Sequence, residues 1–222
     1  METGLYTVPN AARLVAAHQS KVRSWLEAYP NSNAEPIIMR ELPTVGGKTV
    51  LSFLDLIETA FIRHFRVLGY SPQTIRKVAA KLRARHDVLH PFATDKRFRA
   101  DGKVIFEETV EDDGEKKLLN LMNDNFVIGP VVEQSLFKQI LYVEDIAREW
   151  RPLTDFPQIV INPRIAFGKP AVTGKGIPSG LIYRDFLIAG DSDEVAYEYG
   201  ITPQETAAAI GFEMELNRRL LH

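Results

Sequence analysis

Apolar residues recur at helical spacing near the start of the chain and predict two short helices, at about 8–15 and 19–28, joined by a turn at 16–18. Thr7 suits an N-cap, and Pro9 falls in the first helical turn, where a missing N–H costs little. The positions expected to face inward are Val8, Ala11, Ala12, Val15, Val22, Trp25 and Leu26. The spacing therefore predicts a helix-turn-helix.

The outward side of the second predicted helix is polar. It carries four side chains of the types that contact nucleic acid: Gln19, Ser20, Lys21 and Arg23. Helix-turn-helix proteins place such a helix in the major groove, where amide and basic groups reach base edges and phosphates. We therefore expect a DNA-reading helix, with Arg23 on a phosphate. A buried helical hairpin without a nucleic-acid role is the alternative.

The next stretch mixes short apolar runs with longer amphipathic ones. Runs at 37–39 and 49–51 flank a Gly-Gly turn and are expected to pair as a two-stranded wing. Helical spacing over 51–68 and from Ser71 to about Arg85 predicts two more helices, the second with proline in its first turn. The basic side chains on the outward face of that last helix are expected to contact DNA phosphates, foremost Arg76, Lys77 and Lys81.

Residues 93–150 have a weaker pattern. An Asp101-Gly102 pair within 97–108 has the signature of a tight hairpin. The stretch from 116 to 142 fits either strand or helix, and we leave both open. A connecting role is expected, with dimerisation as a further role.

The last part of the chain begins with short apolar runs that predict strands at 159–161 and 164–167. Three helices are expected after them, at about 178–189, 192–199 and 203–220. The side chains expected to be buried in the first are Leu181, Ile182, Phe186 and Leu187. The other two helices form a second helix-turn-helix-like pair with an acidic surface. Because acidic side chains read DNA poorly, we assign this part to protein contacts.

Composition limits the class of protein. The 222 residues are 45% apolar and 25% charged, which is ordinary for a soluble globular chain. Without cysteine, disulfides, thiolate catalysis and cysteine zinc sites are excluded. No apolar run suits a membrane span and no signal-peptide pattern is present, so we expect the cytoplasm.

The fold class predicted from these patterns is mainly α (α+β), in three parts. A winged helix-turn-helix domain is expected at 1–92, a small β-containing connector at 93–150, and a three-helix, helix-turn-helix-like domain at 151–222.

The net charge of −2 conceals a division along the chain. Residues 1–100 contain 15 Lys and Arg against 8 Asp and Glu, a charge of +7, whereas residues 101–222 contain 12 against 21, a charge of −9. A basic half attracts phosphate, while an acidic half is repelled by it and suits a basic protein surface or none. Chance unevenness of solvated faces is the alternative.

Two motifs resemble a metal-binding and a phosphate-binding site. His86 and His90 are spaced like a zinc helix, but Pro91 disfavours helical backbone at His90, and we expect solvated histidines instead of a metal site. Residues 46–49 end like a phosphate-binding loop, yet Leu42 stands where its first glycine belongs, so we expect a turn. We expect neither enzymatic activity nor a cofactor.

The opening residues resemble the N-terminal half of MerR-like winged-helix DNA-binding domains. The positions that match this pattern without a gap are Tyr6, Thr7, Val8, Ala12, Leu14, Val22, Arg23 and Trp25. Ala16 stands where the turn glycine is usual, and His18 where a serine cap is usual.

The final seventy residues resemble a small family of antitoxin-like domains, through Gly168-Lys169-Pro170, Gly174, Ile177-Pro178, Ala189-Gly190, Glu194 and Thr202-Pro203. With both features, the chain resembles the VapB-type antitoxins of type II toxin-antitoxin systems, whose toxin is a PIN-type ribonuclease. They imply a homodimer that binds operator DNA and the toxin from an adjacent gene. Basic side chains that could enter the acidic site of such a toxin are Lys169, Arg184, Arg218 and Arg219. A stand-alone MerR-like regulator, with a C-terminal part for dimerisation or effector sensing, is the alternative.

Overall fold

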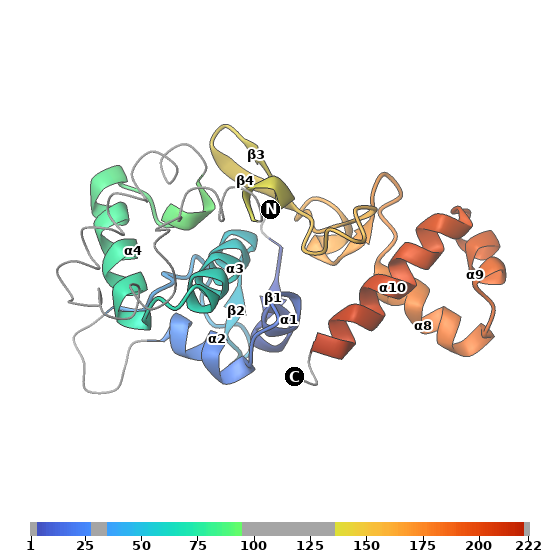
Figure 1. Cartoon of the computed structure of the whole chain (residues 1–222), viewed down its shortest axis with the longest axis horizontal. Coiled ribbons are helices and arrows are strands. Elements are labelled where there is room, and N and C mark those ends of the chain that lie inside the picture. Colours follow the sequence, from blue (N-terminus) through green and yellow to red (C-terminus); the bar gives the residue numbers. More distant parts are fainter. Residues whose placement is uncertain (1–3, 28–34, 95–135, 220–222) are drawn as a thin grey trace.

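The computed structural model of the chain describes residues 4–27, 35–94 and 136–219 (Figure 1). Helices dominate, and the strands form two-stranded antiparallel sheets, which confirms the predicted mainly α (α+β) class. Figure 1 shows an elongated arrangement, with the helix at Pro72–His86 at one end, the last three helices at the other, and the first helix and a β-hairpin near the middle. Across the described ranges, no helix is both long and apolar enough to cross a membrane.

The predicted helix-turn-helix forms at the N-terminus. Helix α1 spans Val8–Leu14 and helix α2 spans Gln19–Leu26. The Thr7 hydroxyl oxygen accepts a hydrogen bond from the backbone N–H of Asn10 (3.3 Å), as an N-cap does. The residues predicted to face inward are all buried, namely Val8, Ala11, Ala12, Val15, Val22, Trp25 and Leu26.

The predicted wing is wrong in its pairing. Strand β2, Val50–Leu51, pairs antiparallel with strand β1, Tyr6–Thr7, whereas residues 37–39 form no strand. The first two residues of that run are fully buried. The N–H of Ile38 donates to the carbonyl oxygen of Trp25 in α2 (3.0 Å). The run is therefore apolar because it packs beneath α2.

Helices α3 and α4 follow the predicted pattern closely. Helix α3, Phe53–Val67, begins with a reciprocal capping box: the N–H of Ser52 donates to Oδ2 of Asp55 (2.8 Å), and the N–H of Asp55 donates to Oγ of Ser52 (3.1 Å). Helix α4, Pro72–His86, begins after the N-cap Ser71. A short 3-10 turn, η1, follows at Pro91–Ala93.

The described end of the connector is a β-hairpin after a 3-10 turn η2, Phe137–Gln139. Strand β3, Ile140–Val143, pairs antiparallel with β4, Ile146–Trp150. Single bridges join the two ends of β4 to other segments, Ile146 to Thr94 and Trp150 to Ile161. The hairpin predicted at 97–108 lies outside the described residues.

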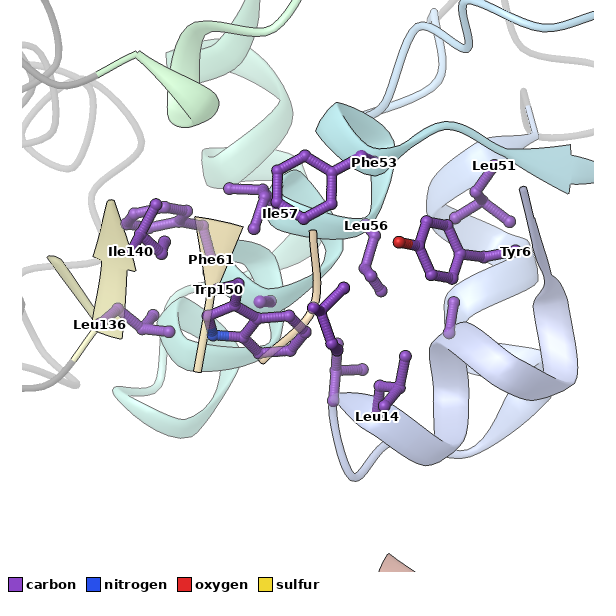
Figure 2. Packing of buried hydrophobic residues seen from close by; sticks show 14 of the residues in the cluster. Tyr6, Leu14, Leu51, Phe53, Leu56, Ile57, Phe61, Leu136, Ile140 and Trp150 are labelled. Atoms are coloured by element: carbon purple, nitrogen blue, oxygen red, sulfur yellow. The ribbon is translucent and has the colours of Figure 1, made fainter. Parts of the chain in front are cut away.

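The hydrophobic core is centred on α3. Figure 2 shows Leu136, Ile140 and Trp150 on one side of α3, facing Ile57 and Phe61, and Tyr6 and Leu14 on its other side. The buried cluster extends without interruption from the N-terminal helices through the hairpin to α10. The domain boundaries at residues 92 and 150 stay predictions.

The C-terminal part matches the predicted helices. Strands β5, Ile159–Val160, and β6, Ala171–Val172, pair antiparallel. The helices, which pack against one another, are α8 (Ser179–Ala189), α9 (Ser192–Tyr199) and α10 (Pro203–Arg219). The capping box before α10 is present, because the N–H of Glu205 donates to Oγ1 of Thr202 (3.2 Å) and the N–H of Thr202 donates to Oε2 of Glu205 (2.8 Å).

Two expectations for this part are wrong. Residues 164–167 form no strand: the 3-10 turn η3, Ala166–Gly168, occupies the end of this run, and Phe167 has φ +57°, a value that extended strands do not adopt. Leu181 and Leu187 of α8 are 39% and 63% exposed, whereas Ile182 is fully buried. Helix α8 thus turns a second apolar side to solvent.

Polar contacts of two side chains, Arg13 and Tyr6, join the N-terminal part of the chain to the C-terminal part. Nη2 of Arg13 in α1 lies 2.6 Å from Oε2 of Glu213 in α10 and donates to Oδ1 of Asn217 (2.9 Å). The Tyr6 hydroxyl donates to the carbonyl oxygen of Gly168 (2.8 Å), and burial raises the pKa of Tyr6, which keeps the hydroxyl protonated. A Cβ at Gly168 would lie 2.4 Å from the Tyr6 hydroxyl. The last turns of α10 therefore lie beside α1 (Figure 1).

Candidate nucleic-acid interface

The N-terminal end of α2 is held by a histidine cap. Nδ1 of His18 accepts a hydrogen bond from the N–H of Ser20 (3.3 Å) and lies 2.8 Å from the Ser20 hydroxyl. Histidine thus takes the place that serine usually has. The side chains predicted to face outward on α2 are all exposed, namely Gln19, Ser20, Lys21 and Arg23. Arg23 forms an exposed ion pair with Glu27 (3.9 Å).

The turn before α2 is tight and depends on a left-handed residue. Ala16 has φ +53°, a conformation that costs an L-residue about 1 kcal/mol and that glycine adopts freely. Its carbonyl oxygen accepts a hydrogen bond from Nε of Arg63 in α3 (3.0 Å). The predicted turn at 16–18 therefore forms with alanine in the glycine position, and α3 holds it.

A groove of about 890 Å³ opens between α2 and the C-terminal end of α10. Its lining residues come from the turn, α2, the last turns of α3, the start of α4 and the end of α10: Ala16, Ala17, His18, Gln19, Lys21, Ser24, Trp25, Arg63, Arg66, Pro72, Arg218 and Arg219. The groove brings together Gln19 and Lys21, predicted to contact DNA, with Arg218 and Arg219, predicted to contact a toxin.

The groove is strongly basic. Of its lining residues, all within the described part of the chain, five are Lys or Arg and none is Asp or Glu. The Arg63 and Arg66 side chains donate to the carbonyl oxygens of Ala16 and Tyr70, which orient the two guanidinium groups without cancelling their charge. The surface can therefore attract an anionic polymer.

One carboxylate lies beside the groove. Oε2 of Glu215 is 2.8 Å from Nε of Arg218, and Oε1 is 2.9 Å from Nε of Arg219. Hydrogen bonds from Arg218, and then from Arg219, lower the pKa of Glu215 to about 2, so it is ionised at neutral pH. It offsets one of the two positive charges, and the groove remains basic.

Sequence reasoning missed Arg63 and Arg66. Both lie on the polar side of α3, between its buried positions, and the spacing alone could have placed them outward. The sequence contains no local signal that this side of α3 lies next to α2.

The basic side chains of α4, which we call the basic strip, do not line this groove: Arg76, Lys77, Lys81, Arg83 and Arg85. Nε of Arg76 donates to the carbonyl oxygen of Glu35 (2.8 Å), and Arg83 donates to that of Ile37. Burial lowers the pKa of Arg83. These two arginines therefore hold the 35–38 segment. The cations of the strip that are exposed are Lys77, Lys81 and Arg85.

The remaining two candidates for toxin contact lie apart from Arg218 and Arg219. Lys169 is exposed directly after Gly168, and neither it nor Arg184 lines the groove. Arg184 is exposed on α8, where its Nε lies 2.7 Å from Oδ1 of Asp185. The four residues predicted to contact the toxin are thus not gathered at one place: Arg218 and Arg219 line the groove, and Lys169 and Arg184 do not.

His90 contradicts the expectation of a solvated side chain, because it is only 5% exposed. Its Nδ1 lies 3.4 Å from Oε2 of Glu58 and 3.8 Å from Oδ1 of Asp55, both fully buried, and its Nε2 lies 3.5 Å from Oε1 of Glu41. Burial alone would lower the pKa of His90, but the carboxylates of Glu41 and Glu58 raise it to about 10. Within the described ranges, no group of such side chains is suited to hold a metal ion.

Comparisons place part of the chain in a known context. The family described as "Protein of unknown function (DUF433)" matches residues 159–212. The match includes β5, β6, α8, α9 and the first half of α10, and it ends before Arg218. A search of curated proteins gives no significant match.

The structure as a whole is similar to the X-ray crystal structure of Rv2018 from Mycobacterium tuberculosis. The TM-score is 0.71 at 24% sequence identity, and the match covers 92% of this chain and 96% of that one. At this identity the likeness concerns the fold alone.

Proposed function

We propose that this protein is a DNA-binding repressor of the antitoxin class, which binds its own operator as a homodimer and keeps a PIN-type ribonuclease toxin inactive. The DNA-binding part of this proposal (the DNA half) rests on one observation. Among the described residues, the groove along α2 is lined by five Lys and Arg side chains and by no Asp or Glu. Its activity is binding, and it needs no cofactor.

Two side chains of α2 have different roles in the proposed DNA binding. Lys21, which lines the groove, suits a phosphate, and contacts of this kind supply affinity without sequence preference. Gln19, in the first turn of α2, suits the edge of an adenine in the major groove. In a two-fold symmetric dimer the recognition helices lie one DNA turn, about 34 Å, apart, so the operator is an inverted repeat.

Duplex DNA from upstream of the gene tests this half. We expect Lys21→Ala to weaken binding to operator and scrambled duplexes alike, and to reduce the slope of log K against log salt by about 1. We expect Gln19→Ala to lower the preference for operator over scrambled DNA by about 1–3 kcal/mol. Fluorescence anisotropy over a range of salt concentrations measures both.

Lys175→Ala is the matched control, because Lys175 is exposed but does not line the groove. It should leave the affinity and the salt slope unchanged. The DNA half is wrong if the wild-type protein shows no salt-sensitive binding at sub-micromolar concentration. Unchanged discrimination in Gln19→Ala contradicts the assignment of this side chain to a base.

The toxin half is supported by the exposed side of α8. Leu181 and Ile188 lie one turn before and one turn after Arg184, and they are 39% and 78% exposed. Interfaces between proteins are centred on apolar side chains and are enriched in arginine. A basic side chain flanked by exposed apolar residues suits the acidic site that the resemblance implies for the toxin, where Arg184 would exchange Asp185 for the carboxylates of the partner.

Co-expression with the adjacent reading frame tests the toxin half. We expect the two proteins to co-purify, and we expect Ile188→Asp to abolish co-purification while leaving DNA binding intact, because a buried charge opposes association. Gln204→Asp, an exposed change in the first turn of α10, is the control and should retain the partner. Elution without a partner favours the alternative, a stand-alone MerR-like regulator whose C-terminal part serves dimerisation or effector sensing.

A further inference from the structure

Two consecutive arginines at the end of α10 line the same groove as α2, the proposed recognition helix. Arg218 and Arg219 line the same groove as Gln19 and Lys21, although about 200 residues of sequence separate them. The side chain of Arg218 is 68% exposed and that of Arg219 is 37% exposed. They are therefore accessible to a ligand that occupies the groove.

The position of these arginines is fixed relative to α2. Arg13, in the helix before α2, binds both Glu213 (2.6 Å) and Asn217 (2.9 Å), which lie about one turn apart on α10. Arg218 and Arg219 directly follow Asn217. Because α1 holds the last turns of α10, the arginines are presented at a defined place beside the helix-turn-helix.

The ligand that best fits this arrangement is a polyanion of extended shape. The groove is lined by Lys21 of α2, by Arg218 and Arg219 of α10, and by Arg63 and Arg66 of α3. Glu215 offsets one of these charges, which leaves the surface basic. A DNA strand presents a ridge of phosphates with one charge every ~3.4 Å, and each phosphate neutralised by Lys or Arg releases counterions.

We infer that the phosphodiester backbone of the bound duplex lies in the groove between α2 and α10, with Arg218 and Arg219 on phosphates next to those contacted by Lys21. The C-terminal helix is then part of the DNA-binding surface, and these two arginines contact DNA instead of a toxin. This inference rests on the proposed DNA-binding function. It assigns to that function residues from beyond the helix-turn-helix.

Paired charge substitutions in the full-length protein test the inference. We expect the double variant Arg218→Gln/Arg219→Gln to weaken binding of operator duplex at least about tenfold at low salt, and to reduce the salt slope by about 2, one for each lost phosphate contact. The double variant Arg218→Lys/Arg219→Lys keeps both charges and should restore the slope. Thermal melting verifies that each variant is folded.

Arg164→Gln is the matched control, since Arg164 is an exposed arginine of the C-terminal part that does not line the groove. It should leave the affinity and the slope unchanged. If the wild-type protein binds duplex DNA and Lys21→Ala weakens it, but the glutamine double variant binds like wild type, the role of α10 is wrong and the DNA-binding function stands. If the wild-type protein shows no salt-dependent binding, both fail.

Discussion

Raising the pH from about 6.5 to 9.5 is expected to lower the free energy of unfolding by on the order of 4 kcal/mol. Folding raises the pKa of His90 to about 10, because Glu41, Glu58 and Asp55 surround its imidazolium, whereas the unfolded chain has a value near 6.5. The stabilisation from such a histidine is complete below the unfolded pKa and is lost as the pH rises toward the folded pKa.

Asp55 acts in the same direction at lower pH. Burial raises the pKa of Asp55 from 3.8 to about 6. Its contribution to the stability of the folded state is therefore lost as the pH rises from 3.8 to about 6. Glu41 acts in the opposite direction toward acid, because its hydrogen bond with His90 lowers its pKa. The cluster therefore favours the folded state most in mildly acidic solution.

Urea denaturation, followed by tryptophan fluorescence at pH 6.5, 8 and 9.5, measures the effect. We expect His90→Gln to be less stable than wild type at pH 6.5 by about 3–5 kcal/mol, since it leaves buried carboxylates without their cation. The variant should lose the fall in stability between pH 8 and 9.5 that deprotonation of His90 causes in the wild-type protein. His18→Asn changes an exposed histidine but keeps an N-cap, and should preserve the wild-type profile. A flat wild-type profile contradicts a charged His90.

Glu213→Gln is expected to destabilise the protein by about 2–3 kcal/mol. The Glu213 side chain is 6% exposed, pairs with Arg13 and accepts a hydrogen bond from the Ser179 hydroxyl (2.5 Å). Removing its charge leaves Arg13 without its carboxylate at the junction of α1 and α10. Because the Arg13 side chain is 27% exposed, solvent reduces the loss below that of a fully buried pair.

A double-mutant cycle with Arg13→Gln isolates the pair. We expect the double variant to be less destabilised than the sum of the single variants, by about 1 kcal/mol or more. Glu198→Gln, the same change at an exposed position on α9, should be neutral. Strict additivity of the two changes would show that the ion pair contributes nothing to the docking of α10.

The helices could be predicted because their signals are local. Four helices are capped through contacts within four residues, by Thr7, Ser52, Ser71 and Thr202. The spacing of apolar residues then indicates which side of each helix is buried. The error at 37–39 arose because a short apolar run is compatible with a strand and with any other buried segment. Strand pairing depends on distant partners: β2 pairs with β1, more than forty residues earlier.

The site was only partly accessible to sequence reasoning. The register of α2 correctly placed Gln19 and Lys21 on the surface. It could not place Arg218 and Arg219 near them, because that depends on a contact between Arg13 and Glu213, 200 residues apart. The division of charge along the chain indicated two opposite ends, yet the acidic half contributes two arginines to the basic groove. His90 likewise needed the folded positions of Glu41, Asp55 and Glu58.

The packing of α10 against both α8 and α1 has a thermodynamic consequence. A ligand that binds the C-terminal helices and shifts α10 also changes the spacing of the arginines from α2, and so changes the affinity for DNA. Reciprocity then requires DNA to change the affinity for that ligand by the same factor. Helix α10 alone would thus couple the binding of a ligand at the C-terminal helices to the binding of DNA at the groove.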